Sequence, residues 1–516
     1  MNPELILRQI ITLINHKKEE AVFCGTAKFK MKNILFAASE CVPFIKTGGL
    51  ADVVGALPKY LNKKQFDVRV VMPYYTNIPE KYRKDFRFKQ CFYMDYTSNH
   101  GNSQHVGIME YEYGGVMFYF IDNEYFFKCD GKSPYTSDLR WDIERYTFFC
   151  KAVLAAMPVI GFHPDIIHCH DWQTGFIPVF LHTTFATHPF YNGTKSIMTI
   201  HNLKFQGVWD KEAIQFYTDL PDYMFTPDKL EFKSDANMLK GGLVYADYIT
   251  TVSETYAEEI KTPEYGEQLD GLLRARSFSL RGIVNGIDYQ IYNPESDQKI
   301  DFRYNINNFR EMKDKNKLAL QKQLGLPQDK NKFVIGIISR LTDQKGLDLV
   351  NWVADRLTDP YTQFVVIGTG EQRYEDMFRY YQGKYPDRFS ANICYSDPLA
   401  HKLYSAADLM MVPSRFEPCG LTQLIALRYG TLPLVRETGG LKDTVEPYNE
   451  YSNTGTGFTF TNYNAEDMLS VINYAKQVYF DTPEKWNEMV KRGMQKDFSW
   501  NASALQYEGM YNWLTY

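Results

Sequence analysis

Short apolar runs alternate with longer amphipathic stretches along most of this chain, and that alternation limits the fold more than any other feature. In the first half the runs cover residues 34–38, 68–72, 116–121, 165–169, 196–200 and 248–252. Such uninterrupted runs are typical of parallel strands buried on both faces, and the stretches between them predict crossover helices. The pattern therefore predicts an α/β fold with an open, doubly wound sheet.

A second series of the same kind follows in the other half of the chain. Its runs cover residues 333–338, 364–367, 391–395, 408–412 and 432–435. Since a chain of 516 residues is too long for one hydrophobic core, we expect two Rossmann-like domains. Sheets of this kind bind ligands at the carboxyl ends of their strands, so the two domains should face a central cleft.

The sequence divides into four segments. We expect an N-terminal helical extension, two Rossmann-like domains, and a C-terminal helix that returns to the first domain, at residues 1–30, 31–295, 296–496 and 497–516. A turn signal at 285–288 and a polar stretch at 296–330 mark the crossing between the domains. The extension either docks on the body of the protein or frays.

The composition excludes several classes of protein. A net charge of -5 argues against a broad basic face for nucleic acid, and no apolar run is long enough to span a membrane. Glu4 and Arg8 interrupt the apolar positions near the N-terminus, so we expect no export signal. The 8 cysteines include no C-x-x-C pair, which indicates reduced thiols in a cytosol-like compartment.

A glycine turn follows the first predicted strand and opens a helix predicted at 50–61. Its sequence is Lys46-Thr47-Gly48-Gly49-Leu50-Ala51-Asp52. Glycines let the backbone approach a ligand, and a helix N-terminus offers free N–H groups beside the Lys46 cation. The turn predicts a site for a phosphate or for sugar hydroxyls, although it is neither a P-loop nor a dinucleotide fingerprint. The alternative is a tight strand-to-helix turn with a solvated lysine.

Further polar stretches follow other predicted strands. They are His168-Cys169-His170-Asp171-Trp172, Thr199-Ile200-His201-Asn202-Leu203, Arg340 with Lys345, Ser414-Arg415-Phe416-Glu417-Pro418-Cys419-Gly420, and Thr438-Gly439-Gly440-Leu441. His168, His170 and Asp171 are metal ligands by type, but successive strand residues point to opposite faces and no further cluster supplies a complete site, so we expect no metal. An anion would instead suit Arg340, Lys345 and the glycine-opened helix start. Taken alone, each of these two cations would be an ordinary solvated side chain.

Together and in order, these stretches resemble the bacterial glycogen synthase and plant starch synthase family, retaining glucosyltransferases of the GT-B fold. The similarity extends from about Met31 to the C-terminus. It rests on Lys46-Thr-Gly-Gly-Leu-Ala-Asp-Val, His168-x-His170-Asp171-Trp172, Thr199-Ile-His201-Asn202-Leu, Ser339-Arg340 with Lys345-Gly346, Ser414-Arg-Phe-Glu417-Pro-Cys-Gly420-Leu, and Thr438-Gly-Gly-Leu. One departure is Gln173, where some relatives carry histidine.

The resemblance implies that the second domain binds an ADP-glucose donor and that the first binds a growing α-1,4-glucan acceptor. The catalytic residues that it implies are His201, Arg340, Lys345, Glu417 and Asp171. Donor contacts are implied for Lys46, Gly48, Gly49, Asp52, Asn202, Asn285, Tyr395, Cys419, Gly420, Thr438, Gly439 and Gly440. Acceptor contacts are implied for Tyr135, Asp171 and Asn237.

Individual roles follow from the same comparison. Arg340 and Lys345 look like the diphosphate ligands, and Tyr395 resembles an aromatic residue that stacks on adenine. His201 resembles the residue that contacts the sugar near the reacting carbon. Glu417 resembles the residue that holds the glucose hydroxyls and supports the developing positive charge; alternatively it only caps the helix that follows.

The family comparison also implies how the reaction proceeds. Glu417 has no convincing nucleophile beside it in the motifs, so a double displacement is not favoured. A front-face reaction is implied instead, in which the departing phosphate oxygen accepts the proton of the incoming hydroxyl, without metal or pyridoxal phosphate. The implied location is the cytoplasm, or the plastid stroma in a plant, and the oligomeric state is open. Rival interpretations are a UDP-sugar transferase, a pyridoxal-dependent phosphorylase and an inactive polysaccharide-binding homologue.

Overall fold

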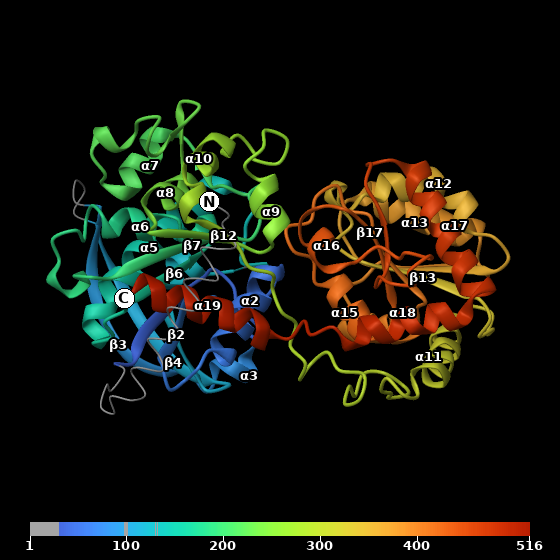
Figure 1. Ribbon diagram of the computed structural model, residues 1–516. Helices are drawn as coiled ribbons and strands as arrows, with labels where there is room; N and C mark the ends of the chain where they lie inside the picture. The colour runs from blue at the N-terminus through green and yellow to red at the C-terminus, as the bar shows by residue number, and fades with distance from the viewer. Residues whose placement is uncertain (1–29, 98–101, 130, 132) are drawn as a thin grey trace, which may run out of the picture.

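The computed structural model describes residues 30–97, 102–129, 131 and 133–516, so the predicted N-terminal extension lies outside the described residues. The chain forms two α/β domains that lie side by side (Figure 1). Each domain has its own hydrophobic core around a mainly parallel sheet, which confirms the predicted pair of doubly wound domains. Within the described part of the chain, none of the helices combines the length and the apolar character needed to cross a bilayer.

The first domain is built on a sheet with nine strands among the described residues, in the order β12-β11-β7-β6-β1-β2-β5-β4-β3. The strands are β1 (Lys32–Ala37), β2 (Phe66–Pro73), β3 (Arg87–Thr97), β4 (Asn102–Tyr113), β5 (Val116–Asp122), β6 (Ile166–His170), β7 (Lys195–Ile200), β11 (Tyr248–Thr251) and β12 (Leu280–Gly282). A small antiparallel sheet adds β8 (Val208–Trp209), β9 (Glu231–Phe232) and β10 (Asp235–Asn237).

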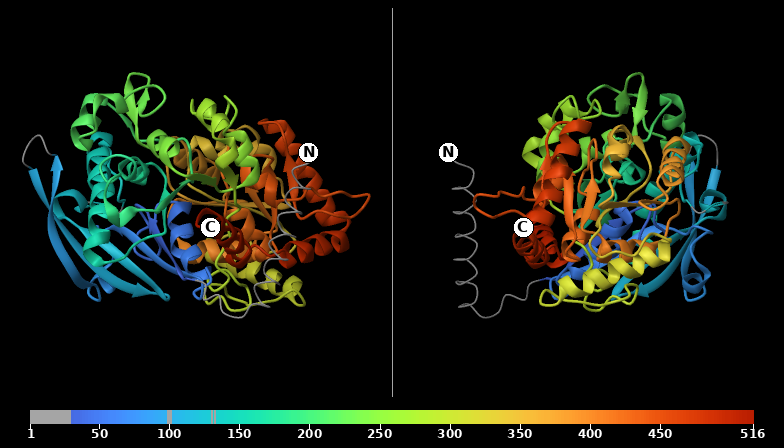
Figure 2. Two further views of the ribbon diagram at one scale, coloured as in Figure 1. Left: turned by 60° about the vertical axis from the view of Figure 1, so that its left-hand side comes forward. Right: turned by 90° about the vertical axis from the view of Figure 1, so that its right-hand side faces the viewer.

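The antiparallel pair β3 and β4 extends the sheet beyond the strands that the apolar runs predicted. It forms the outer edge of the first domain, away from the second domain (Figure 2). Most of β3 is exposed, including Phe88 and Tyr93. An exposed antiparallel strand needs no continuous apolar run, so the criterion that identified the buried strands did not identify this one.

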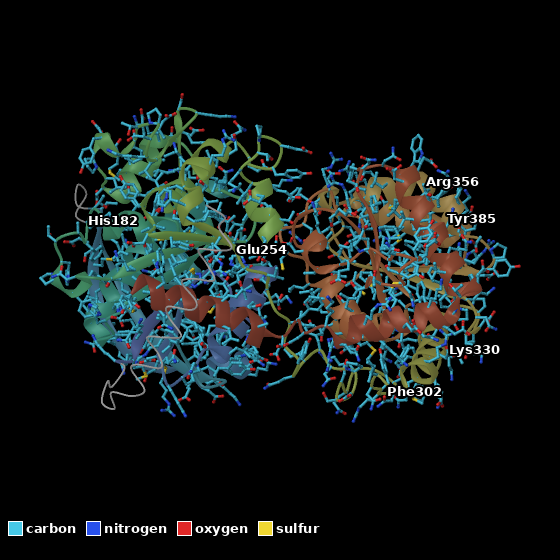
Figure 3. The ribbon with its side chains drawn as sticks, in the orientation of Figure 1. His182, Glu254, Phe302, Lys330, Arg356 and Tyr385 are labelled. Carbon is cyan, nitrogen blue, oxygen red and sulfur yellow. The ribbon has the colours of Figure 1, made fainter. Side chains whose placement is uncertain are left out.

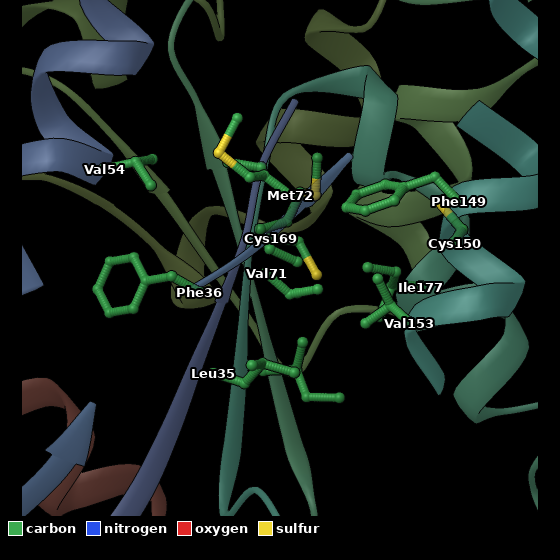
Figure 4. Packing of buried hydrophobic residues seen from close by; sticks show 14 of the residues in the cluster. Leu35, Phe36, Val54, Val71, Met72, Phe149, Cys150, Val153, Cys169 and Ile177 are labelled. Carbon is green, nitrogen blue, oxygen red and sulfur yellow. The ribbon is translucent and has the colours of Figure 1, made fainter. Parts of the chain in front are cut away.

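Helices cover both faces of the first sheet. They are α2 (Gly49–Tyr60), α3 (Glu80–Arg83), α4 (Glu124–Phe127), α5 (Leu139–Ile160), α6 (Phe176–Leu181), α7 (Lys211–Thr218), α8 (Met238–Tyr245), α9 (Glu254–Glu259) and α10 (Asp270–Ala275). Figure 4 shows Phe36 of β1 pointing to the side of Val54 on α2, while Phe149 and Val153 of α5 lie across the strands. Successive strand residues are therefore buried on opposite faces of the sheet, which is why these strands are apolar throughout.

The second domain has a parallel sheet in the order β15-β14-β13-β16-β17-β18. The strands are β13 (Phe333–Ile338), β14 (Thr362–Ile367), β15 (Phe389–Asn392), β16 (Leu409–Val412), β17 (Leu432–Arg436) and β18 (Phe458–Phe460). The helices are α11 (Phe309–Leu324), α12 (Leu347–Leu357), α13 (Gln372–Lys384), α14 (Asp397–Ala406), α15 (Thr422–Arg428), α16 (Gly439–Thr444), α17 (Ala465–Asp481) and α18 (Pro483–Gln495).

The last helix, α19 (Trp500–Leu514), leaves the second domain and packs on the first, where it lies across the blue strands and helices in Figure 1. The chain passes between the domains twice, and the two connecting segments lie side by side. The Ile287 N–H of one segment donates to the Phe498 carbonyl of the other at 2.8 Å. A Cβ atom on Gly286 would lie 2.6 Å from the Trp500 nitrogen, so this close approach requires glycine. Ile283 belongs to the first core and Ile287 to the second, which puts the change of core before residue 295.

Candidate active site

One cleft, with a volume of about 1150 Å³, lies between the two domains and is lined by residues that follow strands of both sheets. The predicted site residues that line it from the first domain are Lys46, Gly48, Gly49, Asp52, Tyr135, Asp171, His201, Asn202 and Asn285. Those that line it from the second domain are Arg340, Lys345, Tyr395, Glu417, Cys419 and Gly420. Parallel strands bring their carboxyl ends to one edge of a sheet, so residues far apart in sequence meet there.

The glycine turn after β1 forms one wall of the cleft. Lys46 Nζ lies 2.7 Å from Asp52 Oδ1, so the predicted cation is paired with an acid one turn into α2. The N–H of Thr47 donates to the carboxylate of Glu40. Glu40 lines the cleft and is 2% exposed, and burial raises the pKa of its carboxyl to about 7. Sequence reasoning missed Glu40, although an acid three residues after the buried strand β1 was the available signal.

Asp171 occupies the sharp turn after β6. Its φ is 56°, an uncommon conformation for a residue other than glycine, which indicates local backbone strain. Its Oδ1 accepts the His201 backbone N–H at 2.7 Å, which joins the ends of β6 and β7. Burial raises the pKa of the Asp171 carboxyl to about 7, against the opposing effect of backbone N–H donors from His201 and Asn202. The first-domain wall therefore carries two acids that gain protons readily.

Glu417 occupies the opposite wall, where it is 8% exposed. Its Oε2 accepts from Lys345 Nζ at 2.6 Å and from Ser414 Oγ at 2.8 Å. The helix that follows, α15, begins after Leu421 without a side-chain cap. The carboxylate is thus held in the cleft by side chains and does not cap that helix.

Two further side chains of the second domain are open to a ligand. Arg340 is exposed in the cleft wall, and its guanidinium has no hydrogen bond or ion pair with any described residue. Tyr395 is 81% exposed and lies just after β15. Asp397, which the motifs did not single out, also lines the cleft and lies 2.6 Å from Lys299 Nζ. Its position as the first residue of α14 was the feature by which Asp397 could have been found.

The possible metal ligands bond to other groups. His168 Nδ1 lies 2.8 Å from the Tyr511 hydroxyl, and His168 Nε2 lies 2.6 Å from Thr199 Oγ1. His170 Nδ1 lies 2.9 Å from His201 Nε2. Across the described residues, no group of three or more His, Cys, Asp or Glu side chains is arranged to hold a metal ion.

Four predicted site residues lie outside the cleft lining: Asn237, Thr438, Gly439 and Gly440. Asn237 is fully buried and caps α8, since its Oδ1 accepts the Lys240 N–H at 2.8 Å. Its Nδ2 donates to Gln206 Oε1 at 2.6 Å, and Gln206 does line the cleft. Any effect of Asn237 on the acceptor would have to pass through Gln206, so the role of Asn237 in acceptor binding stays a prediction.

The glycine-opened start of α16 is occupied by the first domain. Glu259 Oε1 accepts from Thr438 Oγ1 at 2.9 Å and from the Gly439 N–H at 3.0 Å. Glu259 is the last residue of α9, whose first residue, Glu254, is labelled on the face toward the second domain in Figure 3. In this arrangement the free N–H groups expected to meet a phosphate meet a carboxylate of the protein, and donor binding there stays a prediction.

Comparisons with known proteins give the family. The chain matches the starch synthase catalytic domain over residues 33–275 and glycosyl transferases group 1 over residues 319–493. A glycogen synthase from Lachnospira eligens is 62% identical over 482 residues, which are 93% of this chain and 100% of the relative. A glycogen synthase from Lachnoclostridium phytofermentans is 58% identical over 481 residues, which are 93% of this chain and 99% of the relative.

A solved structure agrees with these sequence matches. The catalytic domain of starch synthase IV from Arabidopsis thaliana, bound to ADP and acarbose, has a TM-score of 0.85 and 31% sequence identity. The match covers 94% of this chain and 100% of that one. The resemblance drawn from the motifs and the predicted fold are thus confirmed. The chain belongs to the glycogen synthase and starch synthase family and is a glycosyltransferase of the GT-B fold.

Proposed function

We propose that this glycogen or starch synthase transfers glucose from ADP-glucose, with retention of configuration, to the non-reducing end of an α-1,4-glucan. One observation carries the proposal: Lys345 and Ser414 hold Glu417 in the cleft, which Arg340 also lines with a guanidinium that has no partner among the described residues. A carboxylate and two cations in the lining of one cleft suit a ligand that develops positive charge on its sugar and negative charge on its phosphate.

The second domain holds the donor in this proposal. Arg340 and Lys345 bind the diphosphate, and each charge-assisted hydrogen bond contributes about 1.5–3 kcal/mol. Tyr395 presents an exposed ring on which adenine stacks. ADP in the starch synthase IV structure supports an adenine nucleotide over UDP. No metal or pyridoxal cofactor takes part.

The first domain holds the acceptor and closes the site. Asp171, Tyr135 and His201 all line the cleft. In this proposal Asp171 and Tyr135 contact the acceptor, and His201 contacts the sugar near the reacting carbon. The incoming hydroxyl attacks on the face from which the diphosphate leaves, and the departing phosphate oxygen takes its proton. This route needs no carboxylate nucleophile, whereas double displacement needs a second carboxylate close to the sugar. We place the reaction in the cytoplasm, where the cysteines stay reduced; the described cysteines form no disulfide.

Glucose transfer to glycogen from radiolabelled ADP-glucose, with UDP-glucose in a parallel reaction, tests the proposal. We expect transfer from ADP-glucose that is lost when Glu417 is replaced by alanine. Equal or faster transfer from UDP-glucose would overturn the choice of nucleotide. Binding of glycogen without transfer from either donor would indicate an inactive homologue.

A further inference from the structure

His170 is a buried histidine beside the cleft that the proposed reaction does not use. Its ring packs against both Phe36 and His168, with ring centroids 5.4 Å and 4.4 Å away and interplanar angles of 19° and 27°. The Phe36 and His168 rings also touch each other, with centroids 4.8 Å apart. The side chain is fully buried. His168 is itself fixed at both nitrogens by Tyr511 and Thr199. The His170 ring is therefore held in a buried cluster of three rings, one of which is bonded to Tyr511 of the C-terminal helix α19.

One nitrogen of this fixed ring contacts the active site. His170 Nδ1 lies 2.9 Å from His201 Nε2. The His201 ring makes no other hydrogen bond with a described residue. The His201 side chain lines the cleft, so Nδ1 is its nitrogen that is available to a ligand. Burial lowers the pKa of His201 to about 3 and that of His170 well below its ordinary value, so both rings are neutral. A neutral imidazole carries one N–H, and the 2.9 Å hydrogen bond between the two nitrogens requires that one of them is protonated and the other is not.

The other nitrogen of His170 indicates which ring donates that proton. His170 Nε2 is buried and has no hydrogen-bond partner among the described residues. A proton on Nε2 would leave a buried N–H without an acceptor, and orphaned N–H groups are rarer in proteins than under-satisfied acceptors. The proton is therefore favoured on Nδ1, from which it is donated to His201 Nε2. His201 must then carry its own proton on Nδ1.

We propose that His170 is a positioning residue that holds His201 as the Nδ1–H tautomer, so that His201 offers an N–H donor to a hydroxyl oxygen of the bound sugar. The sugar as ligand rests on the proposed function, whereas the tautomer is a property of the protein without ligand. Losing the donor at residue 170 lets His201 take either tautomer and turn its lone pair to the cleft. The wrong tautomer could only accept from that hydroxyl and would no longer donate an N–H to its oxygen.

A pair of substitutions separates this role from simple packing. His170→Asn places an amide N–H near the position of Nδ1, whereas His170→Phe keeps the ring and removes the donor. We expect kcat for glucose transfer to fall about tenfold in His170→Phe, as for the loss of one hydrogen bond, with ADP affinity unchanged. We expect His170→Asn to recover most of that loss. In the unchanged protein, nitrogen NMR of labelled histidines should show His201 protonated on Nδ1, with its signal identified by its absence from His201→Asn.

Two results would overturn the proposal. One is a wild-type His201 protonated on Nε2, which decides the matter even if both variants fail to fold. The other is a folded His170→Phe variant with kcat within about twofold of the unchanged protein, less than a hydrogen bond would cost. If the unchanged protein transfers no glucose, the proposed function fails while the NMR result still tests the tautomer.

Discussion

Lys345 Nζ and Glu417 Oε2 lie 2.6 Å apart across the second-domain wall of the cleft, although the motifs assign them to different parts of the donor. Both side chains are largely buried, so neither is a freely solvated charge. The lysine has three N–H donors, which lets it keep Glu417 in place and still bind a phosphate oxygen. Breaking the pair would leave a buried charge without its partner, so the two residues should act as one unit.

Glu417→Ala should lower kcat by about a hundredfold or more, with a smaller change in donor KM. In the proposed reaction Glu417 faces the sugar, whose positive charge appears mainly in the transition state, so its contribution should be selective for that state. Initial rates and thermal melting on the same sample measure both effects. Ser414→Ala is the matched control, because it removes one hydrogen bond and keeps the Lys345 pair. A lower melting temperature with near-normal kcat would mean that Glu417 is only structural.

Tyr395→Ala should weaken ADP binding and leave kcat at saturating donor nearly unchanged. Stacking on a base contributes about 1–3 kcal/mol, so the Kd for ADP should rise about fivefold or more. Because the side chain is 81% exposed, the free energy of unfolding should not change. Calorimetric titration with ADP measures the affinity. Tyr451→Ala, a change at another exposed tyrosine of the same domain, is the control, and equal affinities in both variants would refute stacking.

Asp171→Asn should depress transfer to glycogen by about tenfold while ADP affinity stays within about twofold of normal. The amide oxygen can still accept the His201 backbone N–H, so the turn after β6 keeps its shape. What is lost is an ionisable carboxyl group, whose pKa of about 7 leaves it partly charged at neutral pH, on the proposed acceptor side of the cleft. A large loss of ADP affinity, measured in the same titration, would move Asp171 to the donor side.

Glu40→Gln should change the pH dependence of stability. Burial raises the pKa of Glu40 to about 7 from an ordinary value of 4.5, so between these values the folded protein holds a proton that the unfolded chain has lost. The stabilisation is complete below the lower value and is lost as pH rises through the upper one. The melting temperature of Glu40→Gln, relative to wild type, should therefore rise between about pH 5 and about pH 8. A constant difference would contradict the buried, protonated carboxyl.

Glu259→Ala should loosen the contact between the two domains. Its carboxylate caps α16 of the second domain, and loss of such a cap costs about 1 kcal/mol. We expect solution scattering without ligand to become more extended, and ADP with acceptor to restore compactness, because half of the site lies on each domain. Glu258→Ala removes a neighbouring acid that pairs only with Lys261 in the described structure, and it should leave the profile unchanged. Identical profiles for both variants would show that the contact does not hold the domains.

The sequence by itself determined the two doubly wound domains and most of the cleft wall. Buried parallel strands must be apolar on both faces, and their carboxyl ends must meet, so local pattern is enough to place His201, Arg340 and Glu417 at strand ends. The antiparallel β3–β4 pair, in which β3 is mostly exposed, carries no such pattern, and it was not predicted.

Only the tertiary structure decided which groups pair. Whether the helix start at Gly439 meets a phosphate or the Glu259 carboxylate depends on how α9 and α16 pack, and no local spacing encodes that. The contacts of His170 with His201, and of His168 with Tyr511, likewise join neighbouring strands or the far end of the chain. Periodicity reports which face of an element is buried, whereas partners across domains are set by packing between elements that are distant in sequence.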